Sequence, residues 1–263
     1  TNPDPLNERV FSAELGYGFR SGIFTANLNA YYTLWMDKSF VRSTQMSNGD
    51  YARINLGGVD ARHMGIELDF SLRPTRWMDI TGMLSLGNWI WDSNTKGYIY
   101  DSQGQPMTAA LDGTVASGIM ADDHAWLFLK QKGIKVGGSA QTTGAIGMTV
   151  RPMKGLRVSA DWNAYGNNYA DFWLGSGLNG NQTIEVKDPW RIPWGHQLDL
   201  SASYRFKIGN IFATIYGNVN NVYNYNYIMD AQSDALQEGI WQNAYAVMYS
   251  FGRTYTVRVK INF

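Results

Sequence analysis

The sequence has no cysteine among its 263 residues. This absence excludes a disulfide framework, a thiolate zinc site and a cysteine nucleophile. The sequence also has no net charge, because 22 Lys and Arg residues balance 22 Asp and Glu residues, and both signs are scattered along the chain. Nucleic-acid-binding proteins normally carry a basic patch or stripe, so a nucleic-acid partner is not expected.

Long apolar runs are also missing, and a membrane-spanning helix needs about 20 consecutive apolar residues. The three histidines, His63, His124 and His196, do not have the spacing of a metal site on a helix. No glycine-rich phosphate loop precedes a helix, and no nucleophilic serine stands in an elbow motif. The sequence therefore predicts no metal, no cofactor and no catalytic residues.

Aromatic residues are abundant, with ten Trp, sixteen Tyr and eleven Phe, and the chain has 28 Gly. The apolar fraction is nevertheless only 44%. Strands of a membrane barrel need only alternate apolar with polar residues, so a barrel can look hydrophilic on average. The composition permits a transmembrane β-barrel and excludes a membrane helix bundle.

The end of the chain alternates most clearly. Apolar or aromatic residues occupy every second position, at Tyr255, Val257, Val259, Ile261 and Phe263. Polar residues lie between them from Thr254 to Asn262. Successive side chains of a strand point to opposite faces, so this segment predicts a strand with one face suited to hydrocarbon and the other to water.

The same period of two recurs upstream. It predicts nine strands, at residues 11–20, 24–34, 66–73, 78–91, 141–151, 156–164, 197–206, 211–222 and 254–263. The fold class is therefore all-β, an antiparallel transmembrane barrel.

The predicted connections alternate between short and long. Tight turns are expected at 21–22, 74–77, 152–155 and 208–210, and long connections at 36–64, 93–140, 166–196 and 223–250. Outer-membrane barrels have short periplasmic turns and longer extracellular loops. A soluble carbohydrate-binding β-domain has no reason to gather all long loops at one end.

An odd strand number does not suit a complete single-chain bacterial barrel, which has an even count. Open edges inside a bilayer would leave backbone groups unpaired at several kcal/mol each. We therefore expect residues 1–263 to be the C-terminal part of a larger barrel, with earlier strands upstream. A small complete barrel of eight or ten strands, serving as a structural protein or passive pore, is the alternative.

Several segments resemble the C-terminal half of TonB-dependent receptors, particularly those of Bacteroidetes. They are Asn2-Pro3-Asp4-Pro5-Leu6-Asn7-Glu8, the stretches 64–70 and 169–172, Asn218-Val219-Asn220-Asn221-Val222-Tyr223-Asn224, and Phe251-Gly252-Arg253-Thr254-Tyr255 with the alternation that follows. In the first segment Pro5 and Asn7 replace the Leu and Pro of the family pattern, so this match is partial.

The resemblance implies a barrel of about 22 strands filled by an N-terminal plug domain, with these nine strands as the last. It also implies nutrient import (of a siderophore, vitamin, oligosaccharide or peptide) energised by the TonB–ExbB–ExbD system, in the bacterial outer membrane. If the receptor is SusC-like, a SusD-like surface lipoprotein is an expected partner. A barrel enzyme is disfavoured, because it would need a nucleophile and a base at one rim.

The terminal strand carries a second expectation. Tyr255, Val257, Val259, Ile261 and Phe263 resemble the signal read by the barrel-assembly machinery, and the same residues would also face membrane lipid.

Tryptophans in the long connections are the candidate ligand contacts, because aromatic rings stack on sugar rings and aromatic ligands. Trp126, Trp190 and Trp241 lie deep in the predicted loops and are the ligand candidates, although loop packing is the more ordinary role. Trp89, Trp91 and Trp173 lie at strand ends, where an interfacial aromatic girdle is expected.

Overall fold

The computed structural model describes residues 7–46, 49–107 and 124–262. No helix in this part of the chain is long and apolar enough to cross a membrane. The long strands are β1 (Arg9–Arg20), β2 (Phe24–Met46), β3 (Tyr51–Thr75), β4 (Met78–Trp91), β7 (Ala140–Met153), β8 (Leu156–Tyr169), β13 (Gly195–Ile208), β14 (Ile211–Asn220) and β17 (Thr254–Asn262).

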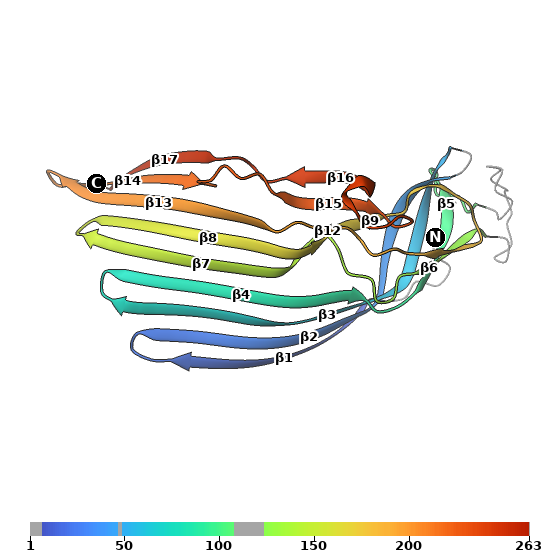
Figure 1. Cartoon of the computed structure of the whole chain (residues 1–263), viewed down its shortest axis with the longest axis horizontal. Helices are drawn as coiled ribbons and strands as arrows, with labels where there is room; N and C mark the ends of the chain where they lie inside the picture. Colours follow the sequence, from blue (N-terminus) through green and yellow to red (C-terminus); the bar gives the residue numbers. More distant parts are fainter. Residues whose placement is uncertain (1–6, 47–48, 108–123, 263) are drawn as a thin grey trace.

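These nine strands lie side by side in the order β1-β2-β3-β4-β7-β8-β13-β14-β17, and each pairs antiparallel with the next (Figure 1). All nine predicted strands are confirmed. The tight turns lie at one end of the sheet and the long connections at the other (Figure 1).

The register separates the side chains into two faces. Leu68 of β3 pairs with Leu28 of β2 and Leu84 of β4, so apolar residues lie opposite one another from strand to strand. The neighbouring Glu67 pairs with Asn29 and Ser85. An outer-membrane barrel turns its apolar face to lipid and its polar face to the interior. We call these the outward face and the lumen face.

The sheet has two outer edges. Within the described residues, β1 pairs only with β2, and β17 pairs only with β14. Strands inside a bilayer need partners along both edges, because hydrocarbon offers no hydrogen bonds to backbone groups.

The connection predicted at 36–64 is wrong, because β2 and β3 continue through it. They pair up to Gln45 and Tyr51, so the two strands form one long hairpin that projects beyond the rest of the sheet (Figure 1). The pattern is interrupted where Asp37 adopts a φ of 59° and the register shifts between Trp35 and Lys38. This bulge disguises the continuation in the sequence.

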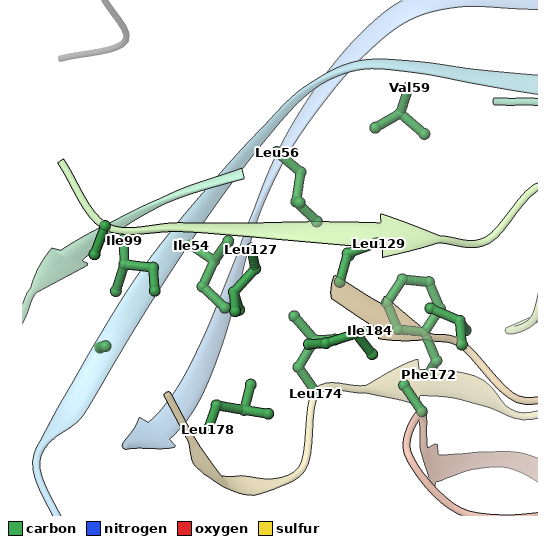
Figure 2. Close-up of a cluster of buried hydrophobic side chains, with 14 of the residues drawn as sticks. Ile54, Leu56, Val59, Ile99, Leu127, Leu129, Phe172, Leu174, Leu178 and Ile184 are labelled. Atoms are coloured by element: carbon green, nitrogen blue, oxygen red, sulfur yellow. The ribbon is translucent and has the colours of Figure 1, made fainter. Parts of the chain in front are cut away.

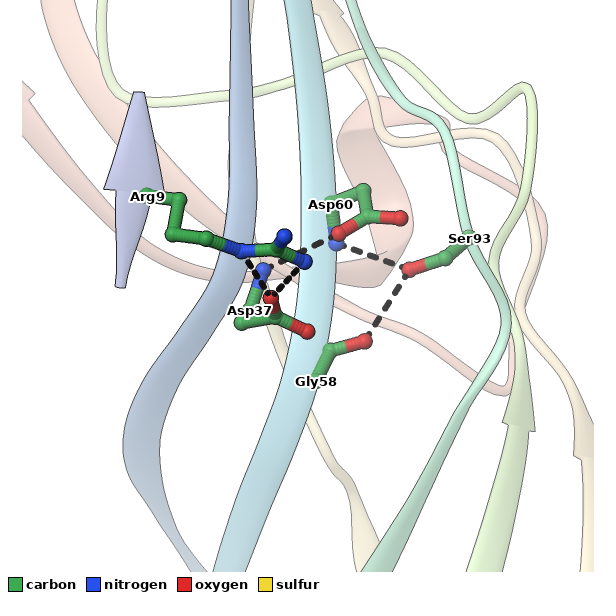
Figure 3. A network of polar contacts seen from close by, with 5 residues as sticks. All are labelled: Arg9, Asp37, Gly58, Asp60 and Ser93. Carbon is green, nitrogen blue, oxygen red and sulfur yellow. Dashed lines mark hydrogen bonds and ion pairs between the residues drawn. The ribbon is translucent and has the colours of Figure 1, made fainter. Parts of the chain in front are cut away.

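A polar network holds the bulge (Figure 3). Arg9 donates to the carboxylate of Asp37 from Nε at 2.9 Å and from Nη2 at 2.6 Å. The Asp37 N–H donates to Oδ1 of Asp60 at 3.0 Å, and the Asp60 N–H donates to Oγ of Ser93 at 2.8 Å. The network therefore ties β1, β2 and β3 to the segment after β4 at the level where the hairpin leaves the sheet.

The other three long connections contain short strands that the alternation does not predict. They are β5 (Thr95–Asp101), β6 (Trp126–Lys130), β9 (Asp171–Trp173), β10 (Ser176–Leu178), β11 (Gln182–Glu185), β12 (Arg191–Ile192), β15 (Ile228–Asp234) and β16 (Ala244–Tyr249). β5, β6 and β11 extend the sheet from the projecting part of β3, whereas β16, β15 and β9 form a separate small sheet.

The two faces of β4 make a direct test of this orientation. Leu84→Arg places a charge on the outward face and is expected to destabilise the barrel by about 2–4 kcal/mol if it lies near the bilayer midplane. Ser85→Arg, its neighbour on the lumen face opposite Glu67, is expected to cost little. Refolding of the full-length protein into lipid vesicles from urea measures both. Equal destabilisation by the two variants would contradict the assignment of faces.

Candidate functional site

The connections at the long-loop end pack around a shared apolar centre (Figure 2). Most of its buried members come from the projecting hairpin, from β5 and β6, and from the segment 172–186. We call this cluster the loop core: Met46, Ala52, Ile54, Leu56, Val59, Ala61, Trp91, Ile99, Met107, Ala125, Leu127, Leu129, Phe172, Leu174, Leu178, Ile184, Val186 and Ala235.

Short alternations build the loop core. Leu127 and Leu129 of β6 are 0% exposed, and so is Ile54 of β3. Each of these residues has partly or fully exposed neighbours on both sides in the sequence. Such two- or three-residue patterns are the signal that could have revealed these strands. They are too short to be separated from loop sequence without their packing partners.

Leu129→Ala removes a fully buried side chain from the loop core and is expected to cost about 2–5 kcal/mol of its local stability. The matched control is Lys130→Ala, which removes a half-exposed ion pair with Glu185, for which about 0–1 kcal/mol is expected. Surface proteolysis of cells carrying each variant of the full-length protein measures the effect. Unchanged cleavage of the Leu129 variant would show that the loops do not fold as one packed unit.

A hollow of about 390 Å³ lies where the sheet meets the loops. We call it the mouth hollow. Thr143 and Tyr165 pair with each other, and Thr143 pairs with Ser85 on the lumen face. The hollow thus borders the interior of the barrel. Its complete lining is Gly138, Ser139, Ala140, Thr143, Tyr165, Asn168, Tyr227, Ile228 and Met229.

Aromatic and neutral polar groups dominate the mouth hollow. The rings of Tyr165 and Tyr227 stack with centroids 5.7 Å apart. Asn168 is buried, and its Nδ2 donates to the carbonyl of Met229 at 2.8 Å. The Tyr227 N–H donates to Oγ of Ser250 at 3.0 Å, which fixes the segment carrying this ring. Burial raises the pKa of Tyr227, so its hydroxyl stays protonated and can both donate and accept hydrogen bonds.

The three candidate ligand tryptophans do not form one site. Trp190 and Trp241 contact each other edge to face at 5.4 Å between centroids. Trp190 is only 8% exposed, while Trp241 is 49% exposed. Trp126 lies elsewhere, on β6, where the ammonium of Lys96 lies 5.0 Å from its ring centroid. None of the three lines the mouth hollow, whose tyrosines the sequence analysis does not single out.

Two of the predicted girdle residues face inward. Trp89 pairs with His63, stacks on its ring at 5.2 Å and donates from Nε1 to the hydroxyl of Tyr31 at 2.9 Å. It lies two residues above Gly87 and four above Ser85, so it shares the lumen face. Trp91 is buried in the loop core, in edge contact with Phe172. A position among lipid headgroups therefore fits neither ring, because odd positions of β4 point away from lipid.

The other interfacial candidate lies off the main sheet. Trp173 of β9 stacks on Tyr245 of β16 at 4.3 Å, within the loop layer. By contrast, the ring of Trp194 lies directly over Gly166 of β8 and is 53% exposed. Gly166 pairs with Thr142, which pairs with Leu86 on the outward face. Trp194 therefore has the outward position that the girdle expectation assigns to Trp89 and Trp91.

The predicted assembly residues share one face. Tyr255, Val257, Val259 and Ile261 of β17 are all more than half exposed, and each pairs with the outward face of β14. Phe263 lies outside the described residues.

Comparison with known proteins agrees with this architecture. The family profile described as TonB dependent receptor-like, beta-barrel, matches residues 1–222. A solved structure, the copper transporter OprC, superimposes with a TM-score of 0.57 at 15% sequence identity. The match covers 97% of this chain and 31% of that chain, so this chain spans about a third of the length of OprC. No curated protein matches the sequence.

Proposed function

Because the chain belongs to the TonB-dependent receptor-like β-barrel family of the bacterial outer membrane, we propose that it forms part of a TonB-dependent transporter that imports a nutrient ligand. The family match over most of the chain, on a sheet of nine lipid-suited strands, is the observation that supports this proposal. The sheet edges at β1 and β17 would pair with further strands of the same receptor, and a plug domain would fill its interior.

The partners follow from the same reading. TonB–ExbB–ExbD would supply the energy for import, and the protein would transport its ligand without chemical conversion. A SusD-like surface lipoprotein would be a partner if the receptor is of the SusC type. The cargo named for OprC is not transferred to this chain, since a likeness at 15% identity concerns the fold.

The mouth hollow is our candidate for a ligand contact at the top of the barrel. Its lining holds stacked tyrosines, hydroxyls and an amide, and none of its nine residues is acidic or basic. Ring stacking with neutral hydrogen-bonding groups suits a sugar ring better than a charged ligand. We therefore place an oligosaccharide first among the four ligand classes. The uptake test also includes the other three classes, a siderophore, a vitamin and a peptide.

The test uses cells that lack the native receptor and carry the full-length gene. Accumulation of labelled maltoheptaose, ferric enterobactin, cobalamin and a hexapeptide is measured with and without a protonophore. We expect one probe to accumulate above its external concentration and to lose this accumulation when the proton gradient collapses. Entry that ignores the protonophore and stops at equilibrium would instead support the alternative, a passive pore.

In the same assay, Tyr165→Ala combined with Tyr227→Ala is expected to lower uptake of the accumulated probe about tenfold, since each stacking contact contributes about 0.5–1.5 kcal/mol. Tyr204→Ala is the matched control, because Tyr204 pairs with Leu156 and Ile215 on the outward face. Equal uptake by the double variant and the control, at equal surface abundance, would show that the mouth hollow does not contribute to transport.

We further propose that Tyr255, Val257, Val259, Ile261 and Phe263 are read by the barrel-assembly machinery. Deletion of Phe263 is expected to lower the folded receptor in outer membranes several-fold without changing its synthesis. Heat-modifiable migration of the membrane fraction measures this. The control is Asn262→Ser, which changes the polar neighbour. Normal abundance of the deletion variant would contradict the proposal.

A further inference from the structure

A row of outward side chains changes from apolar to basic at the loop end of the sheet. It runs across four neighbouring segments as Leu34 of β2, Arg62 of β3, Ile90 of β4 and Lys135, each paired with the next. The next outward row toward the turns contains Met64 of β3, which pairs with Tyr32 of β2 and Asn88 of β4. The row after that is apolar, with Ile66 paired to Leu86. Arg62 and Lys135 thus lie directly above the apolar belt.

Basic residues at the opposite end of the strands point the other way. Arg73 and Arg151 both pair with the carboxylate of Asp79, at 3.1 and 2.6 Å. Asp79 pairs with Thr149, which shares the lumen face with Ser159. These two turn-end arginines therefore face inward, whereas Arg62 and Lys135 at the loop end face outward. The outward face presents these cations toward one leaflet of the membrane.

Lys135 also lines a hollow of about 640 Å³ in the loop layer. The other charged residues of this hollow are Lys187, Arg191, Asp188 and Glu238, so three cations meet two carboxylates. The ammonium of Lys135 lies 5.8 Å from the ring centroid of Tyr169, and Tyr169 pairs with Arg191. The two cations therefore lie on the same side of the strands.

A local reversal in β8 turns that side outward. Asn167 has a φ of 48°, a left-handed conformation that breaks the regular alternation of the strand. Its Nδ2 donates at 2.9 Å to Oγ1 of Thr142, an outward residue paired with Leu86. Its Oδ1 accepts from Nη2 of Arg191 at 2.6 Å. Arg191 is thus anchored on the outward face and uses one of its five N–H donors there.

Hydrogen-bonding capacity remains at these cations. Lys135 donates to Oδ1 of Asn88 at 2.6 Å, which uses one of its three N–H groups. A ligand with several anionic oxygens would satisfy such donors, and phosphate does so in a charge-assisted way.

We propose that this outward basic surface, formed by Arg62, Lys135, Lys187 and Arg191, binds the phosphorylated headgroup of a glycolipid in the outer leaflet. Lys135 and Arg191 contact the phosphate, and the acyl chains lie on the belt below, over Leu86, Ile146 and Trp162. Continuity between the cations and the apolar belt favours a lipid over a soluble anion. Asp188 and Glu238 lie in the same hollow and meet the hydroxyl groups of the sugar.

The test uses the full receptor in nanodiscs of phosphatidylethanolamine that contain either diphosphoryl lipid A or its dephosphorylated form. Native mass spectrometry counts the glycolipid retained per receptor. Since a basic residue near an anionic surface contributes about a fivefold factor in binding, Lys135→Gln with Arg191→Gln is expected to lower retention of lipid A about 25-fold. Lys154→Gln, an exposed cation in the β7–β8 turn, is the control and retains wild-type binding.

Folding of each variant is checked by heat-modifiable migration, and the conservative pair Lys135→Arg with Arg191→Lys is expected to keep most of the binding. Equal retention of the two glycolipids by the wild type would overturn the proposal. So would wild-type retention by a folded double Gln variant. Displacement of lipid A by millimolar inorganic phosphate, with equal binding of phosphate in lipid-free detergent, would assign the surface to a soluble anion instead.

Discussion

Backbone hydrogen bonding in hydrocarbon is the constraint on which the rest of this structure depends. Water is absent there, so each N–H and C=O of a spanning strand must pair with a neighbouring strand. The continuous ladder from β1 to β17 meets this requirement for the interior strands. A continuous ladder also fixes the register, and the register fixes which residues face lipid. Strand pairing therefore decides which residues lie on the outward face and which lie on the lumen face.

The same ladder positions the loops. β2 and β3 keep pairing beyond the point where their neighbours end, and the bulge at Asp37, held by Arg9 and Asp60, redirects them there. The projecting hairpin then gives β5 an edge to pair with, and β5 does the same for β6. Burial of the loop core stabilises this extension, so the long connections act as a folded layer above the barrel.

The sequence alone was sufficient for the spanning strands and insufficient for the layer above them. Alternation over a whole strand, as over the nine residues of β17, reflects two different environments on the two faces and is readable without a structure. Leu127 and Leu129 alternate too, but they are buried by chain segments distant in sequence, such as Ile184. The face of Trp89 could not be read from the sequence for a related reason. Its position near a strand end was correct, whereas its face depends on a register that runs through Ser85 and Glu67.

Asn167 shows how one residue can break the regular alternation of side chains between the two faces of a strand. Counting along β8 from Tyr165 on the lumen face puts Tyr169 on that same face. The left-handed backbone at Asn167 breaks the count, and the bonds of its amide to Thr142 and Arg191 show where the side chains go. As a result, Asn168 lines the mouth hollow while Arg191 lies outside. One strand end thereby contributes side chains to two hollows that lie on opposite faces of the sheet.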